Sequence, residues 1–181
     1  LQWNMLRTPH MRWYHLENGR LELEPRTETL DDLANPSLLA RRIQDHDFSA
    51  ALKLDFEPAD ENGGAGLVLY RRSECHYQFL KEEGALVVTK TEPGGTVEVA
   101  RVAYGAETVV LKAEADGLDL QFSYGEREED LSPLGAVQSM AVLSDEVAGG
   151  FNGPYAGMYA TSDGKPSRAR ASFDWFEYRG E

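Results

Sequence analysis

Hydrophobic and polar residues alternate with a period of two along much of the chain. In residues 50–57, alanine, leucine and phenylalanine largely alternate with lysine, aspartate and glutamate, and residues 97–100 and 118–123 follow a similar pattern. Successive side chains of a β-strand point to opposite faces of the sheet. The pattern therefore indicates strands with one buried face and one solvated face.

Further segments carry the short apolar or β-branched runs that are typical of strands, and turn-forming residues separate them. The dipeptide Asp116-Gly117, between two such runs, predicts a hairpin. Residues 134–144 fit either a short helical turn or a strand. The other expected strands are Leu21–Glu24, Gly66–Tyr70, His76–Lys81, Ala85–Thr91, Thr108–Glu114, Tyr155–Thr161 and Ser172–Arg179.

These strands predict a single all-β domain over residues 1–181. About ten short strands joined by tight turns are typical of a two-sheet antiparallel β-sandwich, and a jelly roll suits a chain of this length. The sequence has no convincing long amphipathic helix. Because the chain begins with Leu1 and not with methionine, we expect that an upstream segment is missing.

The charge of the chain narrows the choice of partners. Its 31 acidic and 18 basic residues give a formal net charge of −13, which would repel a nucleic-acid backbone, whereas a neutral sugar is unaffected. No apolar run reaches the roughly 18 residues that span a bilayer. The single cysteine, Cys75, excludes an internal disulfide and leaves the compartment open.

Candidate catalytic groups are sparse. The four histidines form no metal-binding pair of the HxH or HExxH type, and strand geometry sends Cys75 and His76 to opposite faces. Glu22 and Glu24 share one strand face, as a pair of glycosidase carboxylates would. We favour a solvated strand face for these two glutamates, because the whole chain is acidic, and we expect no catalytic residue here.

Aromatic rings are stronger candidates for sugar binding, because a flat ring stacks on the apolar C–H face of a sugar. Trp13, Tyr14, Tyr70 and Tyr77 form a set that could bind a xylo- or arabino-oligosaccharide in an independent carbohydrate-binding module. For any one ring, packing in the core of a sandwich is the favoured alternative.

The segment from Gly149 to Tyr155 contains three glycines, one asparagine and one proline, which predict a tight exposed loop with Phe151 at its apex. An apolar ring at a loop tip is expected to find an apolar surface. Phe151 either folds back onto the sandwich or docks into a neighbouring domain.

The order of several sequence blocks resembles that of a known family, the concanavalin A-like C-terminal domain of family 43 β-xylosidases and arabinofuranosidases. The resemblance covers nearly the whole chain and is weakest between about residues 81 and 134. The blocks are Trp3–Pro9, Trp13-Tyr14, Gly19–Leu23, Asn35–Gln44, Phe48–Ala50, Leu54–Pro58, Ala65–Val68, Phe151–Ala160 and Phe173–Tyr178.

The resemblance implies a sandwich that follows a five-bladed catalytic β-propeller, which hydrolyses β-xylosides or α-arabinofuranosides with inversion. The catalytic acids belong to the propeller. Phe151 matches the position from which a sandwich aromatic closes one side of the propeller's pocket in some members. A purely structural, docking or oligomerisation role is an alternative, and the full-length enzyme could be a homo-oligomer.

Some related sandwiches hold a structural calcium ion near the chain termini. By that resemblance, Asp174 is the candidate ligand in this chain. A carboxylate next to aromatic residues needs a partner, which could equally be an arginine such as Arg7 or Arg42.

Overall fold

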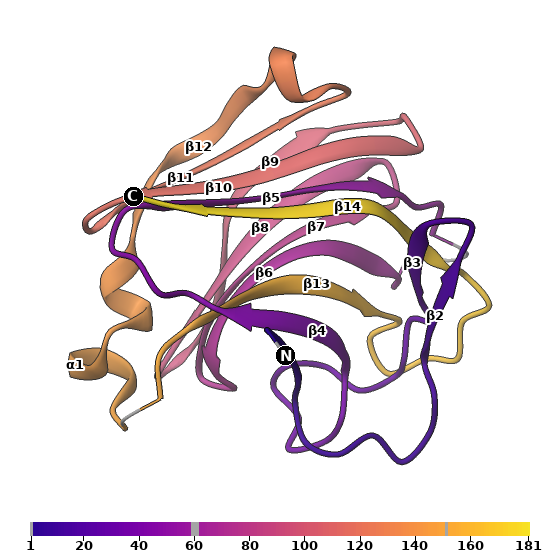
Figure 1. Cartoon of the computed structure of the whole chain (residues 1–181), viewed down its shortest axis with the longest axis horizontal. Coiled ribbons are helices and arrows are strands. Elements are labelled where there is room, and N and C mark those ends of the chain that lie inside the picture. Colours follow the sequence, from indigo (N-terminus) through magenta and orange to yellow (C-terminus); the bar gives the residue numbers. More distant parts are fainter. Residues whose placement is uncertain (1, 59–61, 151) are drawn as a thin grey trace.

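The computed structural model describes residues 2–58, 62–150 and 152–181, and these form two antiparallel sheets that face each other (Figure 1). Each sheet has seven strands in the described part of the chain. Sheet A has the order β1 (Trp3–Met5), β4 (Ser37–Arg42), β13 (Tyr155–Thr161), β6 (Gly64–Arg72), β7 (Cys75–Glu82), β8 (Ala85–Glu92) and β9 (Gly95–Ala103). Sheet B has the order β12 (Ser132–Ser139), β11 (Asp119–Gly125), β10 (Thr108–Asp116), β5 (Phe48–Asp55), β14 (Ala171–Gly180), β3 (Arg20–Leu23) and β2 (Tyr14–Glu17).

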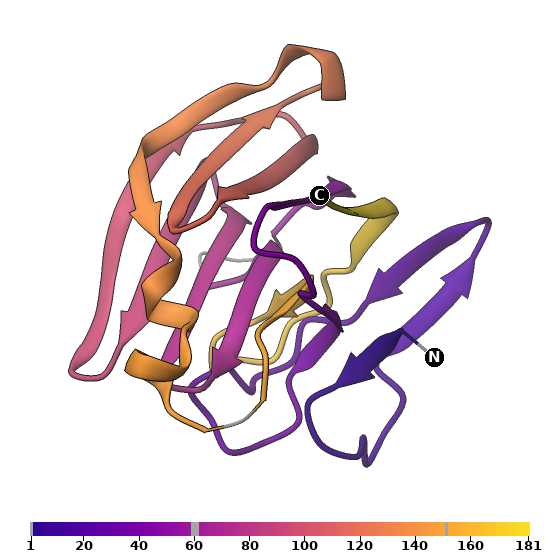
Figure 2. The ribbon, with the colours of Figure 1, turned by 60° about the vertical axis from the view of Figure 1, so that its left-hand side comes forward.

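Short helices occupy the connections on either side of β12. They are the 3₁₀ helices η1 (Glu128–Asp130) and η2 (Met140–Leu143) and the single-turn α1 (Asp145–Ala148). Figure 2 shows η2 and α1 together at one end of the sandwich. Within the described residues, no helix is long and apolar enough to cross a membrane.

The main core lies between the two sheets and is built from the inward positions of the alternating strands. Leu52 and Leu54 of β5 are fully buried, and Phe122 of β11 packs against the rings of Tyr77 and Phe79 at centroid distances of 5.6 and 5.4 Å. Burial of one such side chain contributes about 1.5–3 kcal/mol to the free energy of unfolding. This two-sheet core confirms the all-β sandwich that the alternation predicts.

A second apolar cluster covers the outer face of sheet A. Leu38 of β4, Val68 of β6 and Tyr159 of β13 pack there against Leu30, which comes from the long connection between β3 and β4. Strands of sheet A are therefore buried on both faces. This explains why residues 37–42 show no clear alternation and why β4 is absent from the sequence-based expectations.

Most strand predictions agree with the structure. The turn at Asp116-Gly117 joins β10 to β11, and Gly117 has a φ of 57°, which glycine adopts without strain. Residues 134–144 contain both of the expected alternatives, the end of β12 followed by η2. The short edge strands β1 and β2 carry too few residues for a periodic signal.

Candidate functional site

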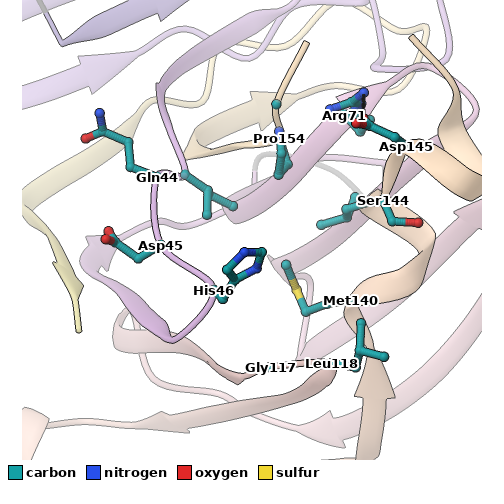
Figure 3. Close-up of a pocket in the computed structure, with 13 residues that line it drawn as sticks. Gln44, Asp45, His46, Arg71, Gly117, Leu118, Met140, Ser144, Asp145 and Pro154 are labelled. Carbon is teal, nitrogen blue, oxygen red and sulfur yellow. Dashed lines mark hydrogen bonds and ion pairs between the residues drawn. The ribbon is translucent and has the colours of Figure 1, made fainter. Parts of the chain in front are cut away.

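The described candidate site is a groove of about 500 Å³ at the end of the sandwich that carries α1 (Figure 3). It lies between the β4–β5 connection, the β10–β11 turn, η2 and α1. Gly153 and Pro154 line its rim, and they belong to the segment that leads from α1 into β13. We refer to residues 149–154 as the rim loop.

Two glycines set the path of the rim loop as it leaves α1. Gly149 ends the helix with its N–H donating to the main-chain oxygen of Asp145 at 2.9 Å. Its φ of 68° and ψ of 176° fall in a region that is essentially restricted to glycine, and Gly150 follows with a φ of 80°. The chain therefore turns sharply here, which agrees with the expected tight loop.

Arg71 holds the first half of the rim loop. The pairing register of β6 with β7 shifts between Tyr70 and Arg72, and such bulges re-aim side chains. The guanidinium of Arg71 forms an ion pair with Asp145 (Figure 3) and donates to the main-chain oxygens of Gly149 and Gly150 at 3.0 and 3.1 Å. The Arg71 side chain is 4% exposed, so this anchor is built into the fold.

The C-terminal end of the rim loop is held by residues at and just after the end of β4. The N–H of Ile43 donates to the main-chain oxygen of Pro154 at 2.9 Å. Arg42 donates to the hydroxyl of Tyr155 at 2.9 Å and lies 5.1 Å from the centre of its ring. Residues 149–150 and 154–155 are thus both held in place. Phe151 itself lies outside the described residues.

The opposite wall of the groove is braced by Tyr178 of β14. Its hydroxyl donates to Asp45 at 2.9 Å and accepts from the N–H of Gln44 at 3.0 Å, while the guanidinium of Arg41 lies 4.0 Å from the centre of its ring. Burial raises the pKa of the Tyr178 hydroxyl above its usual value of 10.0. The β4–β5 connection is therefore tied firmly to sheet B.

The groove combines an apolar wall with hydrogen-bonding groups. His46 is exposed, and its ring faces Met140 across the groove (Figure 3). The two carboxylates on the lining, Asp45 and Asp145, are engaged by Tyr178 and Arg71 respectively. Both carboxylates support the local structure, and the surface as a whole suits contact with a sugar or with another protein surface.

Three of the four rings that the sequence suggested for sugar stacking are buried, Trp13 and Tyr77 in the main core and Tyr70 in the cluster on the outer face of sheet A. Trp13 and Tyr77 are fully buried, and Tyr70 is stacked on the buried His76 at a centroid distance of 5.9 Å. The polar atoms of the rings have protein partners, since Trp13 donates to Asn35 at 3.0 Å and Tyr77 to the main-chain oxygen of Ser139 at 2.9 Å. Buried rings leave no face free for a sugar.

Tyr14 is the remaining member of the expected set. It is half-buried, meets Trp13 edge-on at 5.4 Å and lies near the guanidinium of Arg12 at 5.5 Å from its ring centre. It faces a different groove, on the side of the sandwich. The structure does not bring the four rings together into one binding surface.

Asp174 lies at a register shift between Phe173 and Trp175 of β14. Its carboxylate is 3.5 Å from the ammonium of Lys53 and 3.9 Å from the guanidinium of Arg20, so its partners are these two cations, where the sequence suggested Arg7 or Arg42. No cluster of three or more potential metal ligands occurs among the residues that the structure describes. Calcium binding at Asp174 stays a prediction.

The two strand glutamates are also paired. Glu22 lies 3.1 Å from the guanidinium of Arg170, and Glu24 lies 2.8 Å from the imidazole of His15. Arg170 and His15 therefore hold the two carboxylates separately. This arrangement matches ordinary structural contacts on a strand face.

Sequence reasoning did not identify Arg71, which is the central residue of the described site. Arg71 and Arg72 follow Tyr70 as an ordinary basic pair, and the partner Asp145 is 74 positions further along the chain. The glycines at 149 and 150 gave the one usable signal, because they marked a tight loop that needs an anchor.

The fold is that of a concanavalin A-like β-sandwich domain. Residues 1–179 match the family model described as the β-xylosidase C-terminal concanavalin A-like domain, and the chain belongs to that family. The match confirms the resemblance that the sequence blocks indicated.

Curated relatives and solved structures agree with this assignment. A non-reducing end α-L-arabinofuranosidase of Bacteroides ovatus is 30% identical over 186 residues, covering 99% of this chain and 35% of the relative. The crystal structure of a family 43 glycoside hydrolase protein of Bacillus licheniformis superposes with a TM-score of 0.91 at 26% identity, over 99% of this chain and 37% of that one. A xylan β-1,4-xylosidase of Bacillus halodurans gives a TM-score of 0.82 at 25% identity, over 99% and 39%.

The chain therefore spans little more than a third of the length of these relatives. Their names describe enzymes that act on arabinofuranosides and xylans. The matching family is defined as a C-terminal domain.

Proposed function

We propose that this sandwich packs on the catalytic β-propeller of a family 43 xylosidase or arabinofuranosidase, and that the rim loop closes one side of the propeller's active-site pocket. The family membership and the relatives' greater length support a catalytic module that precedes the sandwich. In this proposal bond cleavage takes place on the propeller, and the sandwich contributes shape to the pocket.

The observation that carries the proposal is the fixing of the rim loop on both sides of Phe151. Arg71 holds Gly149 and Gly150, while Ile43 holds Pro154. Because Gly149, Gly150 and Pro154 are already held, these two ends of the loop lose little further conformational entropy when the loop meets a partner. Such preorganisation suits a loop that completes a binding pocket.

Phenylalanine suits the position that we assign to it. An aromatic ring presents a large apolar face at a small entropic cost, and it can contact the C–H groups of a pentose. A ring at the mouth of the pocket would also exclude water, which strengthens the hydrogen bonds between sugar and protein.

The full-length enzyme provides the test. Phe151→Ala is expected to reduce kcat/KM for aryl β-xylosides or aryl α-arabinofuranosides roughly tenfold, by loss of an aromatic contact of about 1.4 kcal/mol. Leu33→Ala is a suitable control, since Leu33 is exposed and lies in the β3–β4 connection. Unchanged kcat and KM for Phe151→Ala would reject the pocket-closing role.

An independent carbohydrate-binding module is the main alternative function. The burial of Trp13, Tyr70 and Tyr77 weighs against it, because a sugar-binding surface needs accessible rings. Titration of the protein with xylo-oligosaccharides in a calorimeter distinguishes the two functions. Heat of binding that survives a block of the catalytic pocket would favour the alternative.

A further inference from the structure

The two long edges of the sandwich differ. At one edge, β9 and β12 approach so closely that a Cβ at Gly135 would lie 2.6 Å from the Cβ of Ala100. At the other edge, β1 of sheet A and the β2–β3 hairpin of sheet B stand apart, and Figure 2 shows this hairpin projecting from the body of the sandwich. A groove of about 330 Å³ lies between them, which we call the side groove.

The side groove is lined mainly by apolar side chains. Met5, Tyr14, Leu21 and Phe176 lie along it and pack partly against the main core. The groove is therefore an opening of the core to the surface, at a place where neither sheet covers the other.

Leu16 shows most clearly that this surface lacks a cover. Leu16 is the direct cross-strand partner of Leu21, so it points to the same side of sheet B, toward the core. It is nevertheless 77% exposed, and Trp3 on the opposite wall is 38% exposed. Together with the apolar lining of the groove, these two exposed side chains form an apolar patch of the kind that marks an interaction surface.

The charged groups around the groove already have partners. Arg20 lies 2.5 Å from Asp55, and the carboxylate of Asp174 lies 3.5 Å from Lys53. Trp3 meets Phe176 edge-on at 5.2 Å, so these two rings form no parallel platform for a sugar. These features favour an apolar protein surface over a sugar or an ion as the occupant.

The position of β1 indicates which protein surface this is. β1 forms one wall of the side groove, and the N-terminal end of the described chain lies beside it (Figure 1). In the longer relatives the matching domain is C-terminal and spans 35–39% of the chain. Residues that precede β1 in such a polypeptide therefore leave the sandwich at this groove.

We propose that the side groove is the surface against which the polypeptide's own upstream catalytic module docks. The inference rests on the proposed function and adds the location of the contact. Leu16 and Trp3 insert into the module's surface from the two walls of the groove. The exposed inward face of the β2–β3 hairpin becomes part of a core shared between the two modules.

Thiol labelling of the full-length protein tests this docking surface. Cys75 is fully buried, so an introduced surface cysteine can be followed against a low background. Leu16→Cys is expected to react with a maleimide at least about tenfold more slowly than Leu33→Cys, because a covered thiol reacts only after local opening. Leu33 is a matched control, being 81% exposed and outside the groove.

Three other labelling results are possible, and each would overturn the proposal. Equal rates at the two positions would show an open groove. Protection of position 16 that disappears on dilution would assign the groove to a second copy of the chain, and protection that requires added xylo-oligosaccharide would assign it to a sugar. As a second measurement, Leu16→Asp is expected to lower the Tm of the full-length protein more than Leu33→Asp does, and equal Tm values would contradict the docking.

The labelling and the kinetics of Phe151→Ala give separate answers. Slow labelling at position 16 together with unchanged kinetics keeps the docking surface and rejects the pocket-closing loop. Fast labelling together with a loss of kcat/KM rejects the docking surface alone. An upstream sequence without a glycosidase module would reject both proposals.

Discussion

The guanidinium of Arg71 donates to the main-chain oxygen of Gly149 across 3.0 Å, although 78 positions separate the two residues in the chain. The contact joins the end of β6 to the loop that precedes β13, and these two strands are neighbours in sheet A. The sheet therefore supplies both the anchor and the strand into which the loop continues.

Removal of this anchor is expected to destabilise the domain. Arg71→Ala leaves two loop carbonyls and Asp145 without their donor, and charge-assisted hydrogen bonds contribute about 1.5–3 kcal/mol each in favourable cases. Because the Asp145 side chain is 71% exposed and can be solvated, we expect a total loss of about 2 kcal/mol in the free energy of unfolding. Urea denaturation of the two proteins measures this loss.

Arg72→Ala is the matched control for this change. Arg72 is the next residue, its side chain is 45% exposed, and it pairs with Glu74 at 2.7 Å. An exposed ion pair of this kind contributes about 0–1 kcal/mol to the free energy of unfolding. Equal losses for Arg71→Ala and Arg72→Ala would contradict a special role for Arg71.

The backbone of Gly149 gives a second prediction. Any other residue is strained at a φ of 68° and a ψ of 176°, so Gly149→Ala is expected to cost about 1–3 kcal/mol in the free energy of unfolding. Gly105→Ala should change it by less than about 0.5 kcal/mol, because Gly105 has no positive φ and an added Cβ would meet open space. Thermal unfolding of both variants checks this, and a stable Gly149→Ala protein would show that the turn tolerates a side chain.

The third prediction concerns stability in alkali. Burial raises the pKa of the Tyr77 hydroxyl from 10.0 to about 12, so the folded state keeps this proton at a pH where the unfolded state releases it. The stabilisation is therefore complete below pH 10 and is lost as the pH rises toward 12. Tyr77→Phe should remove part of this loss, and the slope of unfolding free energy against pH between these values measures it. A slope equal to that of the unmodified protein would contradict the assignment to Tyr77.

Residue alternation was sufficient to predict the strands whose two faces meet different environments. Leu52 and Leu54 face the core while Lys53 and Asp55 face outward, so the sequence of β5 records both environments. In β4, Leu38 packs on the outer cluster and Leu39 on the main core, which removes the contrast on which the pattern depends.

The candidate sites were harder to predict, because residue type does not determine exposure. Trp13 and Tyr77 have the chemistry of sugar-binding rings but lie in the core, whereas Leu16 has the chemistry of a core residue but lies at the surface. Arg71 acquires its role from a strand bulge and from the position of α1, both of which depend on the tertiary fold.

The rim loop continues into β13, an interior strand of sheet A that is hydrogen-bonded to β4 on one side and β6 on the other. A force on this loop is therefore distributed over three strands, and none of these strands lies at the edge of the sheet. Residues between the two anchors can then be exchanged or inserted while the sheet beneath keeps its pairing. We expect natural variation in loop length and in the aromatic residue at position 151 to concentrate between the two anchors, while the strands beneath the loop stay the same.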